Sequence, residues 1–216
     1  MAIKIVALSD THSLHSQVKI PECDILIHAG DFTGNGSMTH QQNFIDWLYD
    51  QPAKRKVVVA GNHDLFAEKY YDITKAMFAH KQITYLENQV TVIEGIKIYG
   101  SPMTPTFMNW AFMEERDKIH KYWDEIPDDT DIVVTHGPAY GILDMTYTLA
   151  GFPRDSVGCV ALNKRLVDIK PKYHIFGHIH SGYGIEKIDE TTYINCSVCD
   201  EQYGAVNNPV EFTYVN

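Results

Sequence analysis

Five short motifs concentrate the side chains that proteins use to bind divalent metal ions. Asp, Asn and His supply carboxylate, amide and imidazole donors, and no motif contains a cysteine. This donor set favours a borderline or hard divalent ion over a structural zinc held by thiolates. The motifs are Asp10-Thr11-His12, Gly30-Asp31, Gly61-Asn62-His63-Asp64, Thr135-His136-Gly137 and Gly177-His178-Ile179-His180.

Spacing within the motifs predicts that several donors meet at one point. In an extended segment residues i and i+2 face the same way, so Asp10 pairs with His12, and His178 pairs with His180. Two metal ions about 3.5 to 4 Å apart need one shared ligand, and a carboxylate with two oxygens serves best. Asp31 is the predicted bridge. Together the motifs predict a two-metal hydrolytic site.

Every motif follows an apolar run that is typical of a buried strand. These runs are residues 3–9, 25–29, 57–60, 131–135 and 173–177. In an open α/β sheet the carboxyl ends of the strands form one rim where ligands bind, so the motifs should converge there. Each motif alone is more often a turn or a helix cap, because Gly, Asn and Asp tolerate left-handed backbone. Their joint occurrence after successive strands favours the metal site.

Between the motifs the sequence alternates between helix and strand patterns. Apolar residues recur at helical spacing in 38–49, which follows the cap candidate Ser37, and in 114–126 and 159–169, which are each ended by a proline. Two hairpins are also predicted. One joins 91–93 to 96–99 across Glu94-Gly95, and the other joins 184–188 to 191–196 across Asp189-Glu190.

The order D-x-H, G-D-x-x-x-x-G, G-N-H-D, T-H-G and G-H-x-H resembles the calcineurin-like metallophosphoesterase superfamily across residues 10–180. The resemblance implies an α/β fold, a four-layer α/β/β/α sandwich of two mixed sheets flanked by helices, with the metal site at the rim formed by the strand C-termini. It implies that one metal is held by Asp10, His12, Asp31 and His180, and the other by Asp31, Asn62, His136 and His178. It also implies that His63, which holds no metal, donates the proton to the leaving oxygen.

A closer similarity links the chain to small metallophosphoesterase domain proteins with phosphodiesterase activity toward cyclic nucleotides. The implied function is therefore hydrolysis of small phosphodiesters, with a cyclic nucleotide or another small phosphate ester as substrate. The segments that carry this similarity are 135–138, 158–159, 170–172, 177–184 and 193–195.

One departure from the family separates this chain from phosphoprotein phosphatases. Their second motif reads G-D-x-x-D-R-G, in which an acid orients the catalytic histidine and an arginine binds phosphate. Here Gly34 and Asn35 occupy those two positions. A phosphomonoesterase or a protein serine/threonine phosphatase is therefore the alternative rather than the first prediction. A non-catalytic scaffold on the same fold ranks third, because none of the proposed ligands is missing.

The electrostatics of such a site predict its mechanism. Two divalent ions carry a total of about four positive charges, and Asp10 and Asp31 cancel about two of them. The remaining positive potential attracts a phosphate. Water that bridges the metals loses its proton near neutral pH, and the hydroxide attacks phosphorus in line. His63 then protonates the leaving alkoxide, while Asp64 either orients His63 or caps a helix that begins near Leu65. Manganese is the first choice for both ions, with iron, zinc, cobalt or nickel as alternatives.

Candidate substrate contacts lie next to the ligand motifs. The irregular segment 101–112 carries Phe107 and Trp110, either of which is suited to stack on a base. Tyr183 and Asn62 are further candidates. The alternative is that the aromatic rings simply seal the edge of the sandwich.

Length and composition predict a single domain over residues 1–216. The formal charge of -10 argues against a stable nucleic acid partner and against membrane binding, because both use clustered Lys and Arg. No secretory signal, membrane-spanning run or lipidation motif is visible, which predicts a cytoplasmic protein. Four cysteines are too few for a disulfide framework, so buried reduced thiols are expected.

Overall fold

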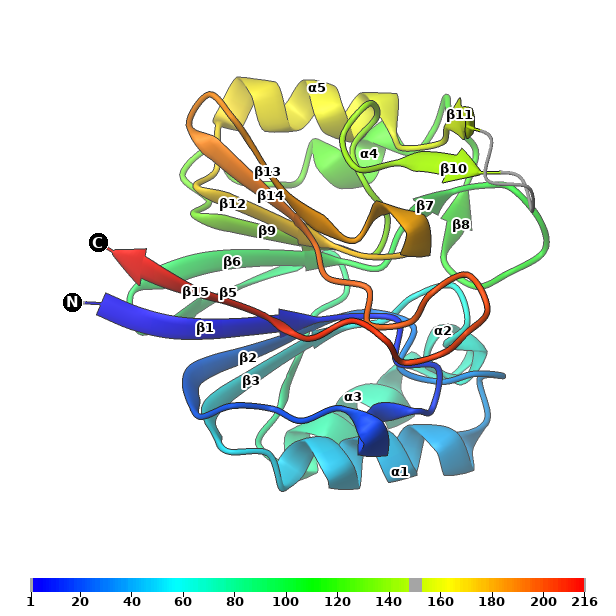
Figure 1. Ribbon diagram of the computed structural model, residues 1–216, viewed down its shortest axis with the longest axis vertical. Helices are drawn as coiled ribbons and strands as arrows, with labels where there is room; N and C mark the ends of the chain where they lie inside the picture. The colour runs from blue at the N-terminus through cyan, green and yellow to red at the C-terminus, as the bar shows by residue number, and fades with distance from the viewer. Residues whose placement is uncertain (1, 148–152, 216) are drawn as a thin grey trace.

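Two mixed β-sheets lie face to face in the computed structural model, which describes residues 2–147 and 153–215 (Figure 1). The first sheet contains, in spatial order, β15 (Val210–Val215), β1 (Ala2–Leu8), β2 (Cys23–Ala29), β3 (Ala53–Val59) and β4 (Thr84–Tyr85). The second contains β13 (Gly184–Ile188), β14 (Thr191–Asn195), β12 (Tyr173–Phe176), β9 (Ile132–Thr135), β6 (Ile96–Ser101) and β5 (Gln89–Ile93). The inner pairs of both sheets are parallel, and antiparallel pairs lie at the outer edges.

Alternation along the strands separates the apolar packing between the two sheets from the apolar packing under the helices. In β1, Ile3, Ile5 and Ala7 point into a cluster that contains aliphatic residues of both sheets, so this cluster lies between the sheets. Val6 and Leu8 point the other way and pack with residues of the helices. Strands buried on both faces read as continuous apolar runs, which is why periodicity of two is absent from them.

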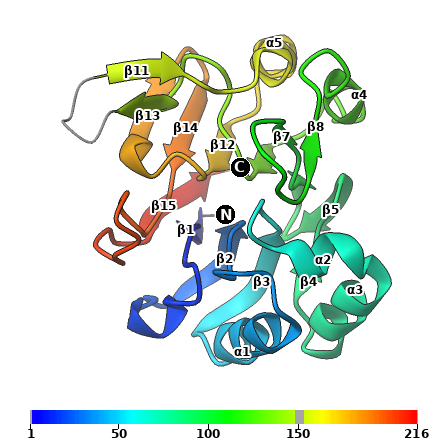
Figure 2. The same cartoon turned by 90° about the vertical axis from the view of Figure 1, so that its right-hand side faces the viewer.

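Helices cover the outer face of each sheet (Figures 1 and 2). On the first sheet lie α1 (Met38–Tyr49), α2 (Leu65–Lys69) and α3 (Tyr71–His80), and on the second lie α4 (His120–Trp123) and α5 (Val160–Ile169). The N-terminus of α1 is capped by Ser37, whose side chain accepts a hydrogen bond from the His40 amide at 3.2 Å. The predicted four-layer sandwich is therefore confirmed.

Smaller elements lie beside the edge of the sandwich that faces the viewer in Figure 2. Two short ribbons are formed by β7 (Thr104–Pro105) with β8 (Met113–Glu114), and by β10 (Met145–Tyr147) with β11 (Pro153–Ser156). Two 3-10 turns are η1 (His15–Gln17) and η2 (His180–Gly182).

The predicted helix 114–126 is wrong over most of its length. The backbone of Glu114 belongs to β8, where its carbonyl accepts a hydrogen bond from the Thr106 amide at 3.0 Å, so it cannot start a helix. Within residues 114–126, regular α-helix is confined to α4. The other two predicted helices are found as α1 and α5, and both predicted hairpins form.

The cysteines agree with the prediction, because all four are buried and unpaired. In the described residues no helix has the length and apolar character needed to cross a membrane.

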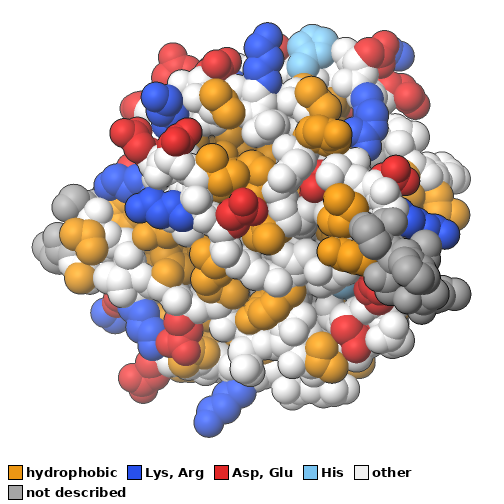
Figure 3. Space-filling view, turned by 45° about the horizontal axis from the view of Figure 1, so that its top comes forward, with side chains coloured by type: hydrophobic (Ala, Val, Ile, Leu, Met, Phe, Trp, Pro, Cys, Tyr) orange, Lys and Arg blue, Asp and Glu red, His pale blue; other side chains and the backbone are white. Residues whose placement is uncertain are grey.

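Lys and Arg side chains on the face shown in Figure 3 are interspersed with Asp and Glu. The single domain over 1–216 stays a prediction, and its terminal residues 1 and 216 lie outside the described part.

Candidate functional site

All seven predicted metal donors converge at the edge where β1, β2, β3, β9 and β12 end. Six of them, together with His63, have ligand atoms in overlapping groups, each with its atoms within 4.8 Å of one another. The groups are Asp10, His12 and His180, then His12, Asp31 and His63, and then Asp31, His136 and His178. The remaining predicted donor, Asn62, joins the last group because its Oδ1 lies 2.9 Å from His136 Nε2.

Asp31 lies between the two sets of donors. Its Oδ2 is 3.8 Å from Nε2 of His12 on one side and 3.3 Å from Nε2 of His136 on the other. On the first side, Oδ1 of Asp10 is 3.4 Å from Nε2 of His180. One carboxylate oxygen therefore faces both groups, which is one way in which a carboxylate can bridge two ions.

The histidine hydrogen bonds fit the binding of divalent metal ions. Nδ1 of His136 donates to the Ala29 carbonyl at 3.0 Å, and Nδ1 of His180 donates to the Asp200 carbonyl at 2.7 Å. Such bonds fix the ring and direct Nε2 into the site. Nε2 of His12 and Nε2 of His180 face each other at 3.2 Å, an arrangement that is favourable when a cation is shared between them.

The two buried carboxylates, Asp10 and Asp31, are held in the charged form that binds metal ions. Burial would raise both pKa values, but the facing imidazoles of His180 and His136 outweigh burial and hold the pKa of Asp10 and of Asp31 below the usual range. Burial would lower the pKa of His136, but Asp31 raises it to about 9. A metal ion at Nε2 of His136 therefore competes with a proton.

Four of the predicted metal ligands have left-handed backbone. Asp10, His12, Asp31 and His178 all have left-handed φ values, of 53°, 41°, 54° and 68°. These conformations are uncommon for residues other than glycine and cluster at functional sites. The extended backbone expected for the i, i+2 pairs is therefore wrong, because tight turns aim these side chains, although Asp10 and His12 still meet in one group. As a result His178 joins the group of Asp31 and His136, not that of His180.

Glycines next to the donors leave the space that close approach requires. A Cβ atom at Gly61 would overlap the carboxylate of Asp31, and one at Gly177 would overlap the carboxylate of Asp10 and the side chain of Ser9. These positions accept no larger residue without moving a predicted ligand.

A set of supporting residues was missed by the sequence analysis. The Asp10 carboxylate accepts hydrogen bonds from Ser9 Oγ at 2.6 Å and from Ser197 Oγ at 2.8 Å. The buried Asp64 carboxylate accepts from the Gly61 amide at 2.8 Å and from the Thr33 hydroxyl at 2.8 Å. Asp64 thus ties the loop after β3 to the loop after β2, and it neither orients His63 nor caps α2 with its side chain.

His63, the predicted proton donor, is held on three sides. Its Nδ1 donates to the Gly34 carbonyl at 3.0 Å, and its backbone amide donates to Asp31 Oδ1 at 2.7 Å. Its ring stacks on Trp110 with centroids 4.4 Å apart and planes 26° apart. These contacts fix the ring and leave Nε2 for a substrate.

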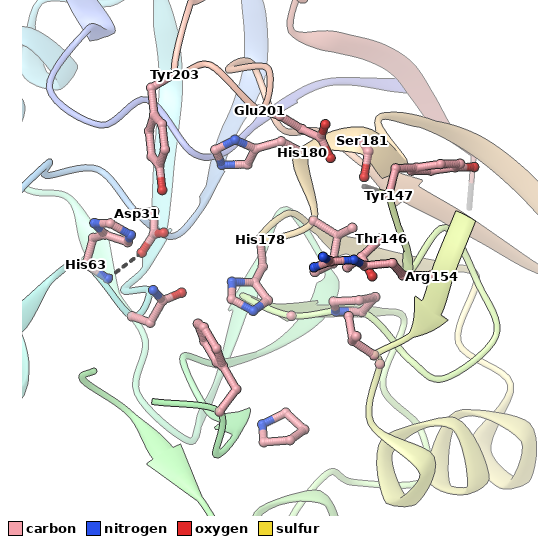
Figure 4. Close-up of a pocket in the computed structure, with 18 of the residues that line it drawn as sticks. Asp31, His63, Thr146, Tyr147, Arg154, His178, His180, Ser181, Glu201 and Tyr203 are labelled. Atoms are coloured by element: carbon pink, nitrogen blue, oxygen red, sulfur yellow. Dashed lines mark hydrogen bonds between the residues drawn. The ribbon is translucent and has the colours of Figure 1, made fainter. Parts of the chain in front are cut away.

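A cavity of about 520 Å³ opens in front of the predicted donors (Figure 4). Its opposite wall includes Thr146, Tyr147 and Arg154 of the β10–β11 ribbon. Tyr203 projects into it from the segment after β14. Tyr203 was also missed, since nothing near it in the sequence resembles a ligand motif.

The predicted substrate contacts divide into two kinds. Phe107 lines the cavity, with its ring 5.6 Å from that of His178, and Asn62 lines it too. Among the described residues Trp110 and Tyr183 are not part of the lining. Trp110 packs on His63 instead, and the Tyr183 hydroxyl donates to the Asn208 carbonyl at 2.9 Å.

Comparison with known proteins gives a family for this chain, relatives in sequence and a neighbour in fold. The sequence model of the calcineurin-like phosphoesterase family matches residues 3–182. The chain is 36% identical over 232 residues to Metallophosphoesterase domain-containing protein 1 of Homo sapiens, covering 96% of this chain and 69% of that protein. It is 33% identical over 223 residues to a UPF0046 protein of Caenorhabditis elegans, covering 97% and 74%. In fold it is similar to phosphopantetheinyl hydrolase of Mycobacterium tuberculosis, with a TM-score of 0.66, 14% identity and coverage of 96% and 95%.

Proposed function

Because the chain belongs to the calcineurin-like phosphoesterase family, we propose that it hydrolyses small phosphodiesters, cyclic nucleotides first among them, at a centre of two divalent metal ions. Family membership itself supports metal-dependent hydrolysis of phosphate esters. The observation that carries the proposed two-metal centre is the Asp31 oxygen that faces two donor groups, with His63 directly beside it.

Manganese would suit the mixture of oxygen and nitrogen ligands in this donor set. Asp10, His12, Asp31 and His180 would hold one ion, and Asp31, Asn62, His136 and His178 would hold the other. Bound divalent ions supply Lewis acidity toward a phosphoryl oxygen and acidify water near neutral pH.

His63 supplies the proton that the leaving oxygen needs. The Gly34 carbonyl accepts from Nδ1 and thereby assigns the second nitrogen, Nε2, to the cavity. Trp110 supports the opposite face of the ring. A general acid held within reach of the leaving group raises the rate most for esters whose leaving groups are strongly basic.

Three observations favour a small diester over a phosphoprotein. The backbone carbonyl of Gly34 takes the orienting role that an acid has in protein phosphatases. Arg116, a nearby arginine on the cavity wall, has its guanidinium bonded to the carbonyls of Val157 at 2.8 Å and Gly158 at 2.9 Å. A walled cavity of about 520 Å³ also lies in the range that small-molecule ligands occupy.

The test is a substrate panel with the manganese-loaded protein and a chelator-treated control. The panel contains bis-para-nitrophenyl phosphate, para-nitrophenyl phosphate, 2',3'- and 3',5'-cyclic nucleotides and a phosphopeptide. We expect kcat/KM to be highest for the diesters and to vanish with chelation. A higher kcat/KM for the phosphopeptide or the monoester would establish the phosphatase alternative, and bound metal without turnover of any ester would establish the scaffold.

A further inference from the structure

Tyr203 occupies the part of the cavity nearest to the predicted donors. Figure 4 shows its ring extending into the cavity, with the hydroxyl directed toward Asp31 and His63. The ring centroid lies 4.8 Å from that of His12 and 5.3 Å from that of His180. Tyr203 is 51% exposed, and among the described residues its hydroxyl has no hydrogen-bond partner. A phenolic donor is therefore open to a ligand at this point.

A tightly bonded loop holds Tyr203 in this position. Asp200 accepts hydrogen bonds at its Oδ1 from the Gln202 amide at 3.0 Å and the Gly204 amide at 2.8 Å. The carbonyl of Asp200 also accepts from Nδ1 of His180 at 2.7 Å. The same loop thus fixes a predicted metal ligand and the tyrosine, so their relative position is set by backbone.

The backbone at Tyr203 is strained in the same way as at the predicted ligands. Its φ is 60°, a left-handed value that is a clear outlier for a bulky residue. A half-exposed ring gains little from burial to offset that strain, and glycine would fit the turn with less cost. Asp10, His12, Asp31 and His178 share this left-handed backbone, and so do residues away from the site such as Gln82 and Lys170, so the position of the hydroxyl carries the argument.

Arg154, on the opposite wall of the cavity, is one candidate to bind the oxygens of the phosphate. Asn35 stands where related phosphatases have an arginine, and Arg116 is bonded to backbone carbonyls. A hydroxyl that points at the shared carboxylate from the open side is placed to meet a phosphate bound there. Hydrogen bonds from a neutral donor to a charged oxygen are among the stronger ones in proteins.

We propose that the Tyr203 hydroxyl donates a hydrogen bond to a non-bridging phosphate oxygen of the bound ester. This role rests on the proposed function, because it requires a phosphate held by the two-metal centre. It assigns to a tyrosine of the segment after β14 the task of binding phosphate in this chain.

The test removes the hydroxyl and keeps the ring. Tyr203→Phe is compared with the wild type and with Tyr173→Phe, whose hydroxyl donates to the Thr213 carbonyl at 3.3 Å outside the cavity lining. For each manganese-loaded protein we would measure metal content, thermal unfolding, the Kd of inorganic phosphate by calorimetry, and kcat/KM for a diester. We expect Tyr203→Phe to keep its metal and its stability but to bind phosphate about 10- to 100-fold more weakly, while Tyr173→Phe matches the wild type.

Unchanged phosphate affinity in Tyr203→Phe would overturn the proposal. Loss of metal in Tyr203→Ala, together with full phosphate binding in Tyr203→Phe, would also overturn it, because the ring would then serve only to hold His12 and His180. If the wild type hydrolyses no diester while phosphate binding still depends on the hydroxyl, the assignment of Tyr203 stands and the proposed diester substrate fails.

Discussion

Replacing His63 with alanine separates proton donation from metal binding. The Asp31 carboxylate accepts from the backbone amide of residue 63, and this bond survives the substitution. The bond from Nδ1 to the Gly34 carbonyl is lost, but that position is half-buried, so water replaces the donor. The variant should therefore keep its metal content and its fold.

The expected loss of rate depends on the leaving group. A general acid contributes about 10²- to 10⁴-fold, which corresponds to about 2.7 to 5.4 kcal/mol in the barrier. His63→Ala should show a loss of this size for a diester that releases an alkoxide. A diester that releases a nitrophenolate needs little protonation and should lose much less.

The assay is kcat/KM across diesters whose leaving groups range from nitrophenolate to alkoxide, with metal content measured in parallel. The wild type should depend weakly on leaving-group basicity, and His63→Ala should depend on it steeply. Equal losses across the series would refute the reasoning and show that His63 positions the phosphate.

Two further predictions use the contacts around this site and the buried histidines. Trp110→Ala should lower kcat for poor leaving groups about 2- to 10-fold with little change in KM, because it loses the stack that supports His63; a rise in KM alone would show instead that Trp110 contacts substrate. Burial lowers the pKa of both His28 and His174 to about 3, so the unfolded chain binds their protons more readily, and stability should fall as pH drops from about 6.5 toward 3. Urea unfolding would give the free energy of unfolding of His174→Gln at each pH. Between about pH 6.5 and 3 this free energy should fall less steeply than in the wild type, by about 1.4 kcal/mol per pH unit. An equally steep fall would contradict the lowered pKa of His174.

Local signals account for the parts of the fold that the sequence predicts well. The helix 38–49 matches α1 because Ser37 caps it and its apolar residues keep helical spacing. The first hairpin turn forms at Glu94 and Gly95, with φ values of 53° and 82°, because glycine there accepts left-handed backbone. The donor motifs fall at the rim because each follows a buried strand.

Contacts between distant segments account for what the sequence does not predict. The Ser197 hydroxyl reaches Asp10 across 187 positions, and Arg116 reaches the Gly158 carbonyl across 42. Local spacing carries no information about such pairs, so the supporting serine was missed. Helix 114–126 was over-predicted because β8 pairs with β7, where the Glu114 carbonyl accepts from the Thr106 amide. Trp110 was assigned to substrate for the same reason, because its stacking partner lies in a different loop.

The central claim is a pair of metal ions that share Asp31, and counting bound metal tests it most directly. Chelator-treated protein would be titrated with manganese, bound ions counted per chain by elemental analysis, and diester hydrolysis followed at each step. Asp31→Asn would be compared with the wild type and with Asp24→Asn, which alters a surface carboxylate paired with Lys54. The account predicts two ions per chain in the wild type and in Asp24→Asn, with activity appearing as the second ion binds, and fewer than two ions with almost no activity in Asp31→Asn. Full activity with one ion per chain, or two ions and unchanged activity in Asp31→Asn, would contradict it.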